Sequence, residues 1–145
     1  MNRDLLFQQL LKDEGSRSFV YDDATGEPVQ AGSTLIGNPT IGIGRELSKT
    51  GLSESEIRFM VTNDIDRIES ALSALSFWDR LNDNRKLVLA NMAFNLGTHG
   101  LFQFVGMMAA LEVNDYNRAA NEILDSKAAK QLPNRYHRLA RMMRE

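Results

Sequence analysis

The amino-acid sequence concentrates its glycine and proline residues in one segment near the N-terminus. Seven of the ten glycines and two of the three prolines lie between Gly15 and Gly51 of this 145-residue chain. Glycine and proline interrupt helices and mark turns, so this segment cannot be a series of long helices. Two runs inside it, "FVY" (19–21) and "TIGIG" (40–44), are rich in β-branched or aromatic residues and indicate short strands. We therefore predict a small, loop-rich β lobe over about residues 16–50.

Helical patterning occupies the remainder of the chain. Residues 1–15 have the pattern of an amphipathic helix that Asn2 can cap and Gly15 can end. The tetrapeptide "SESE" (53–56) is a capping box in front of a long run of apolar residues at helical spacing. Further helix starts are predicted at Asn82 or Asp83, at Asn114 and at Pro133, with a helix end at Gly97.

Together these patterns predict an α+β fold in a single domain over residues 1–145. The β lobe covers about residues 16–50, and the helical lobe combines residues 1–15 with residues 53–145. A composition of 43% hydrophobic and 25% charged residues is that of a chain able to form a core. A ligand cleft is expected where the sheet meets the helices.

Several classes of site and of location are disfavoured by composition. The chain has no cysteine, which excludes disulfides, thiolate metal sites and cysteine nucleophiles. His99 and His137 have no neighbouring ligand residues in sequence, so no metal site and no cofactor are predicted. No apolar segment follows Arg3, so neither a secretory signal nor a membrane span is expected. Synthesis in the cytoplasm is therefore expected, and an external target would require a separate release route.

Charge is distributed unevenly along the chain. The net charge is −2, which by itself indicates no nucleic-acid partner. Residues 127–145 hold six Lys or Arg and one acid, a balance of +5, so residues 1–126 carry a balance of −7. A basic C-terminal helix on an acidic body fits weak contact with an anionic envelope surface, and equally a solvated helix face.

Acidic residues flank the junction between the first helix and the first strand. Glu14 stands at the helix C-terminus, where the macrodipole and the unpaired carbonyls disfavour a charged carboxyl group. A general acid that must keep its proton is one explanation, and a solvated, frayed helix end is the other. Asp23 precedes turn residues and, taken alone, is a turn acid. Paired with Glu14, it would supply the second carboxyl group that glycoside hydrolysis needs.

The run "TIGIG" adds a third element to this pair. Gly42 and Gly44 alternate with isoleucines, and small residues on one strand face let a ligand approach the backbone. Thr40 would place its hydroxyl group on that strand near an acid. A strand weakened by glycine is the alternative explanation.

Five short segments occur in an order that resembles the phage-type lysozymes, glycoside hydrolase family 24. They are "EG" at 14–15, "YDD" ending at Asp23, "TIGIG" from Thr40, and the later segments "NMAFNLG" (91–97) and "LPNRYHRLA" (132–140). The resemblance covers nearly the whole chain. It implies a lysozyme-like fold with a small N-terminal β lobe, a larger helical lobe and a cleft between them.

The resemblance also implies roles for individual residues. Glu14 matches the family's general acid, and Asp23 with Thr40 matches the pair that positions the attacking water or stabilises developing positive charge. Phe94 matches a residue that lines the substrate cleft, and Arg135 matches a buried arginine that neighbours the catalytic glutamate. Asp22 is expected to be a bystander.

Two features depart from the family pattern. Arg45 follows "TIGIG" where a well-known member has histidine. It is a candidate substrate-binding residue, by pairing either with a glycan carboxyl group or with Asp23. The segment 24–39 is longer than in that member, and a hairpin lip on the cleft is one expectation for it.

The function that this resemblance implies is that of a monomeric muramidase that cleaves the β-1,4 bond between N-acetylmuramic acid and N-acetylglucosamine in peptidoglycan, with inversion. Host-cell lysis by a phage endolysin, released through a separate membrane pore, is the expected role. Three alternatives remain open at this point: a lytic transglycosylase acting on the same bond, a non-catalytic murein-binding homologue, and a virion-associated lysozyme used at entry.

Overall fold

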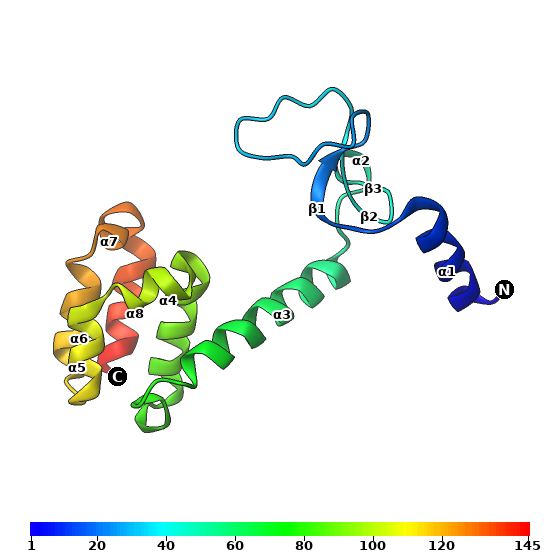
Figure 1. Cartoon of the computed structure of the whole chain (residues 1–145). Helices are drawn as coiled ribbons and strands as arrows, with labels where there is room; N and C mark the ends of the chain where they lie inside the picture. The colour runs from blue at the N-terminus through cyan, green and yellow to red at the C-terminus, as the bar shows by residue number, and fades with distance from the viewer. The chain divides into compact units, whose positions relative to one another are not determined.

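The computed structural model describes all residues from Met1 to Glu145, which form two compact units. The first unit is Met1–Ile57 and the second is Arg58–Glu145. Helix α3 (Glu54–Leu72) begins in the first unit and continues into the second. Figure 1 follows the chain from one end to the other. Each unit is described by itself below.

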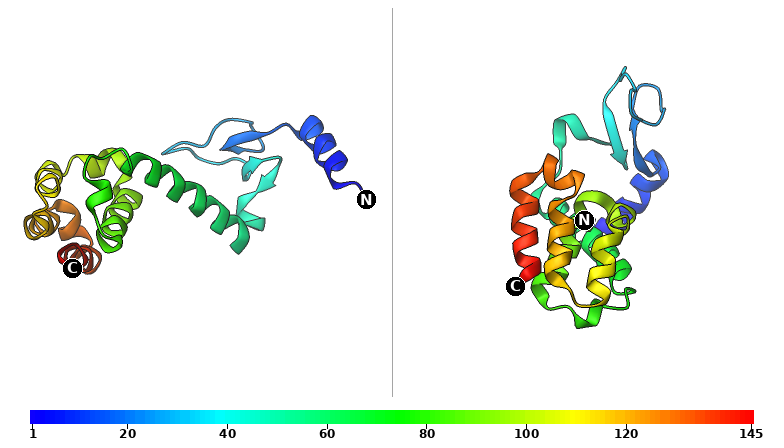
Figure 2. Two further views of the ribbon diagram at one scale, coloured as in Figure 1. Left: turned by 90° about the horizontal axis from the view of Figure 1, so that it is seen from below. Right: turned by 90° about the vertical axis from the view of Figure 1, so that its left-hand side faces the viewer.

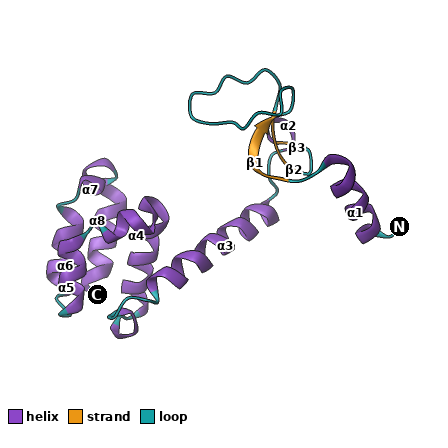
Figure 3. Ribbon diagram, viewed as in Figure 1, coloured by secondary structure: helices purple, strands orange, loops and turns teal.

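The first unit contains a short helix, a small sheet and a long loop. In chain order its elements are α1 (Arg3–Glu14), β1 (Arg17–Asp22), β2 (Pro39–Gly42), β3 (Arg45–Glu46) and α2 (Leu47–Thr50). The three strands pair antiparallel in the order β1-β2-β3, with Tyr21 opposite Thr40 and Thr40 opposite Glu46. Figure 3 shows the long loop between β1 and β2 in teal. The expected β-rich segment is therefore present, with its strands at both ends of this loop.

Local hydrogen bonds define the ends of α1 as the sequence predicts. The side chain of Asn2 accepts from the N–H of Leu5 at 3.0 Å, which caps the helix. Gly15 adopts a φ of 71°, and its N–H donates to the carbonyl of Leu11. A positive φ strains residues that have a Cβ, so glycine allows the sharp turn that follows Glu14. None of the residues in α1 is buried.

The second unit is helical. After the remainder of α3 come a 3₁₀ turn, η1 (Trp78–Arg80), and five helices: α4 (Asp83–Phe102), α5 (Val105–Glu112), α6 (Tyr116–Leu124), α7 (Lys127–Gln131) and α8 (Pro133–Arg144). Figure 2 shows α8 beside α6, and α8 also contacts α4 and α7. Pro133 begins α8, as predicted. No helix of the protein combines the length and the apolar character needed to cross a bilayer.

An apolar core fills the second unit. Its largest fully buried side chains come from the end of α3, from α4, α5, α6 and α8, and from the segment between α3 and η1: Tyr136, Phe77, Leu72, Leu89, Met92, Leu101, Met107, Leu111, Ile123, Leu139, Met143 and Val88. Trp78 is 8% exposed and belongs to the same cluster. Met107 and Trp78 are thus packing residues of this core.

The α+β class is confirmed, and one predicted helix boundary needs correction. Gly97 has non-helical backbone angles (φ 74°, ψ 156°) and ends the first helical stretch of α4, as predicted; a second stretch follows it up to Phe102. The cap of α6 is Asp115, whose side chain accepts from the N–H of Arg118, whereas Asn114 has a φ of 57° in the preceding turn. An N-cap residue usually has β-region backbone angles, whereas Asn114 adopts the left-handed conformation that asparagine tolerates, so it is not the cap.

Candidate active site

Glu14 is the last residue of α1 and lies next to the turn between β2 and β3. Its side chain is exposed, and its Oε2 atom lies 3.9 Å from the position that a Cβ on Gly44 would occupy. Gly44 has a φ of 74°, so this turn favours glycine for its backbone conformation as well. The glutamate carboxyl group and the end of the "TIGIG" segment are therefore neighbours within the first unit.

Asp22, the last residue of β1, uses its carboxylate to close the long loop. The side chain is buried and accepts three backbone hydrogen bonds, from Ile36 at 2.6 Å, Ala24 at 2.9 Å and Gly37 at 3.0 Å. The hydrogen bond from Ile36 is the main cause that lowers the pKa of Asp22; burial opposes it, and the bonds from Ala24 and Gly37 add to it. Asp22 is thus a fixed structural anion with its oxygens already engaged.

Asp23 lies beside this closure with its side chain exposed. Its Oδ1 atom accepts from the backbone N–H of Asn38 at 2.7 Å, and its Oδ2 atom accepts from the side-chain amide of Asn38 at 3.2 Å. A Cβ on Gly37 would lie 2.2 Å from Asp23 Oδ1, a distance that real Cβ atoms essentially never show. Gly37 therefore leaves the space that the Asp23 carboxylate occupies.

Thr40 is the second residue of β2 and is only 3% exposed. Its hydroxyl group donates to the carbonyl of Asn38 at 3.2 Å. The expected strand thus carries Thr40 directly opposite Tyr21, one position before Asp22 in the neighbouring strand. The side chain of Thr40 and that of Asp23 both contact Asn38.

Arg45 makes its ion pair with Glu56 rather than with Asp23. The Arg45 Nη1 atom lies 2.5 Å from Glu56 Oε1. Glu56 also completes the predicted capping box of α3, because its Oε2 atom accepts from the N–H of Ser53 at 2.8 Å while its own N–H donates to Ser53 Oγ at 3.3 Å. Hydrogen bonds from Ser53, first from its backbone and then from its hydroxyl group, and the contact with Arg45 lower the pKa of Glu56 to about 2.

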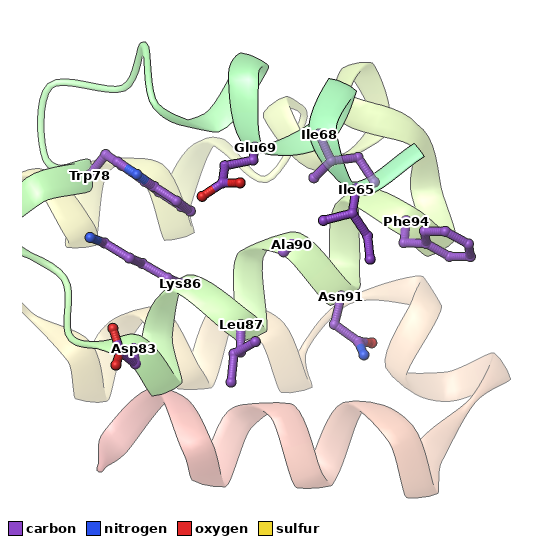
Figure 4. Close-up of a pocket in the computed structure, with 10 residues that line it drawn as sticks. All are labelled: Ile65, Ile68, Glu69, Trp78, Asp83, Lys86, Leu87, Ala90, Asn91 and Phe94. Atoms are coloured by element: carbon purple, nitrogen blue, oxygen red, sulfur yellow. The ribbon is translucent and has the colours of Figure 1, made fainter. Parts of the chain in front are cut away.

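Phe94 and Arg135 belong to the second unit. Phe94 is 51% exposed and lines a cavity of about 590 Å³ between the second half of α3, η1 and α4. Figure 4 shows this cavity, with Phe94 at one end, Trp78 at the other and the Glu69 carboxylate between them. Arg135 donates from Nε to Asn91 Oδ1 at 2.8 Å and from Nη2 to the carbonyl of Asn91 at 3.1 Å. Asn91 lines the same cavity, so Arg135 supports its wall from α8.

The first unit therefore brings four of the predicted site residues onto neighbouring elements: Glu14 on α1, Asp23 after β1, Thr40 on β2 and Arg45 on β3. The sequence did not single out Gly37 or Asn38. Both precede Pro39, where a turn is expected. No local pattern reveals that both lie against Asp23, which is 14 positions before Gly37 and 15 before Asn38.

A family model described as "Phage lysozyme" matches residues 12–140 of this chain. The match includes every residue discussed above as a site candidate and covers most of both units. The chain therefore belongs to the phage lysozyme family. Membership indicates, in general terms, a lysozyme-like peptidoglycan hydrolase.

Two curated proteins illustrate the range of similar sequences. Probable T4-type lysozyme 2 of Dictyostelium discoideum is 26% identical over 149 residues, which include 82% of this chain and 86% of that protein. Pre-baseplate central spike protein Gp5 of Enterobacteria phage T4 is also 26% identical, over 137 residues that include 82% of this chain. The match spans only 24% of the spike protein, so this chain resembles one part of that larger molecule.

Proposed function

We propose that this protein is a muramidase that hydrolyses the β-1,4 bond between N-acetylmuramic acid and N-acetylglucosamine, with inversion at the anomeric carbon. The observation that carries the proposal is the grouping of two acids and a threonine on consecutive elements of the first unit, inside the segment that matches the phage lysozyme family. Asp22 is occupied by three backbone hydrogen bonds, whereas Glu14 accepts no such bonds. The entire chain would act as one catalytic domain, with α1 belonging to the helical lobe.

In this proposal Glu14 is the general acid. It donates its proton to the glycosidic oxygen as the bond between that oxygen and the anomeric carbon breaks. Asp23 accepts a proton from a water molecule on the opposite face of the sugar, and the resulting hydroxide attacks the anomeric carbon. Inverting glycosidases of this kind hold their two carboxyl groups roughly 6.5–9.5 Å apart so that the water fits between them.

The remaining candidates would bind substrate or support the site. Phe94, exposed at the end of an apolar cavity, offers an aromatic surface to a glycan. Arg135 would act through the wall residue Asn91 rather than on the reacting atoms. Arg45 already pairs with Glu56 through its Nη1 atom, so it would bind a glycan carboxyl group through the guanidinium N–H groups that this ion pair leaves free. Lysis of a phage host, by a monomer that reaches the wall through a separate membrane pore, completes the proposal.

The decisive experiment compares Glu14→Gln with the matched control Asp13→Asn. Both changes remove one carboxyl group, from adjacent exposed residues of α1. Glu14→Gln should reduce the clearing of permeabilised bacteria by at least about 10³-fold, because a general acid and its electrostatic setting are lost together. Asp13→Asn should lyse like the unmodified protein. Equal lysis by both variants would remove Glu14 from the mechanism.

Mass spectrometry of the released muropeptides distinguishes the rival chemistry. Hydrolysis adds one water and leaves a reducing N-acetylmuramic acid end. A lytic transglycosylase instead leaves a 1,6-anhydro end that is lighter by one water. Anhydro products would refute the hydrolytic mechanism, and binding of murein without any product would indicate a non-catalytic homologue.

A further inference from the structure

Asn38, the residue before β2, contacts both members of the proposed water-activating pair. Its backbone N–H and side-chain amide donate to the two oxygens of Asp23, at 2.7 Å and 3.2 Å respectively. Its carbonyl accepts from the backbone N–H of Asp23 at 3.1 Å and from the hydroxyl group of Thr40 at 3.2 Å. One residue therefore makes four hydrogen bonds that all end on Asp23 or Thr40.

Two donors on one carboxylate restrain more than its position. A single hydrogen bond lets a carboxylate turn about the bond, whereas separate donors to Oδ1 and Oδ2 also fix the plane of the group. Gly37 adds to this restraint because the space beside Asp23 Oδ1 admits no side chain at that position. The remaining lone pairs of Asp23 consequently point in a fixed direction.

The bond from Thr40 to the Asn38 carbonyl assigns a direction to the Thr40 hydroxyl group. A hydroxyl group has one proton to donate and two lone pairs to accept with. Because the proton of Thr40 is directed to Asn38, its oxygen is left to act as an acceptor. A water molecule held between the two side chains would then donate one hydrogen to Asp23 and the other to Thr40, which leaves its own lone pair free for attack.

We propose that Asn38 is a positioning residue, which fixes the plane of the Asp23 carboxylate and sets Thr40 as a hydrogen-bond acceptor for the attacking water. This inference rests on the proposed function, because it assigns a task to Asn38 only if Asp23 and Thr40 serve the water. Asn38 touches neither proton donor nor sugar in this scheme and acts through its two neighbours.

The side-chain amide of Asn38 can be removed without opening the loop. The three backbone hydrogen bonds to Asp22 close the loop independently, and the backbone contacts of Asn38 survive a change to alanine. Since Asn38 is exposed, its truncation leaves no cavity. Asn38→Ala therefore removes only the side-chain hydrogen bond to Asp23 Oδ2, with little effect expected on folding.

The experiment measures kcat and KM separately on soluble, defined peptidoglycan fragments, together with a thermal melt of each variant. Asn38→Ala should lower kcat by roughly 10- to 100-fold with KM within about twofold, since misplacement of a reacting group lowers the rate of the chemical step. Asn38→Asp keeps the shape but sets a second carboxylate against Asp23, so its kcat should be lower still. Ser33→Ala, which removes one hydrogen bond elsewhere in the same loop, is the matched control.

Each result decides the question. The positioning role is supported if the melting temperatures are unchanged and kcat is lowest for Asn38→Asp, higher for Asn38→Ala and highest for the Ser33→Ala control. An unchanged kcat, a rise in KM alone, or a loss of kcat that merely follows a lower melting temperature overturns it. If Asn38→Ala is fully active while Glu14→Gln is inactive, only this inference fails; if Glu14→Gln is as active as the unmodified protein, the proposed function fails first.

Discussion

All of the buried apolar side chains of this protein lie between Leu72 and Met143, in the second unit, whereas the buried side chains of the first unit are Asp22 and Thr40. The second unit is therefore stabilised mainly by apolar surface removed from water, which is a strong but non-directional force. The first unit is held largely by hydrogen bonds, which are directional and fix the orientation of the groups they join.

The difference fits the proposed function, in which the reacting side chains belong to the first unit. A helical core tolerates exchanges among apolar side chains of similar volume, because its stability depends on filled space and not on the exact position of a single polar atom. The proposed mechanism needs a defined plane for the Asp23 carboxylate, and the two hydrogen bonds from Asn38 restrain that plane. The hydrogen bond from Ile36 to Asp22 holds the neighbouring loop closed. Directional bonds thus hold these side chains in place although the first unit has no buried apolar side chain.

The largest stability effect should follow from truncation in the second unit. Leu139→Ala removes a side chain that is 1% exposed, and such deletions cost about 2–5 kcal/mol through lost burial and the cavity left behind. The free energy of unfolding can be measured with denaturant and the fluorescence of Trp78, the only tryptophan. Leu132→Ala, at a leucine that is 43% exposed, should cost less than half as much. Equal losses would mean that burial is not what stabilises this unit.

Removal of the Asp22 carboxylate should have a local effect in the first unit. Asp22→Ala leaves the N–H groups of Ala24, Ile36 and Gly37 without their acceptor, so the loop over residues 24–37 should open more often. We expect proteases to cut this loop about tenfold faster, while the unfolding midpoint reported by Trp78 does not move. Asp13→Ala, a change at an exposed acid of α1, is the control and should be cut at the original rate.

A pH-dependent effect should arise at the start of α3. The pKa of Glu56 is lowered from 4.5 to about 2, so its contribution to stability is complete above about pH 4.5 and is lost as the pH falls toward 2. Glu56→Gln should flatten this part of the stability curve, which hydrogen exchange of the first amides of α3 can follow. Glu69→Gln, on the same helix but outside the capping box, should keep the original curve. A flat curve for the unmodified protein would contradict the assigned interactions.

Features that depend on neighbouring residues could be predicted from the sequence, and features that depend on distant partners could not. The Asn2 cap, the Gly15 turn and the reciprocal bonds of Ser53 and Glu56 each involve residues within four positions, and all were predicted. The task of Asp22 was missed, because two of its three backbone donors lie 14 and 15 positions downstream. Its neighbour Asp23 was chosen through the family resemblance, without any sign of the contacts that hold either acid.

The candidate site shows the same limit. The sequence and the family resemblance picked out Glu14, Asp23 and Thr40, but gave Arg45 a glycan carboxyl group or Asp23 as partner. In the structure its partner is Glu56, which the sequence had identified only as the capping-box residue of α3. An arginine side chain reaches partners that sequence spacing does not specify, so its ion pair had to be found in three dimensions.

The smallest effect is expected at an ion pair of the second unit. Arg67 and Asp64 form a salt bridge at i, i+3 on α3, with the arginine side chain 74% exposed. Exposed pairs of this type contribute little, because water screens the attraction and two long side chains lose freedom. Arg67→Ala should therefore change the free energy of unfolding by less than about 0.5 kcal/mol in denaturant titrations at low and high salt. A loss comparable to that of Leu139→Ala would show that surface charge, rather than the buried core, stabilises the helical unit, and would remove the contrast between the two units.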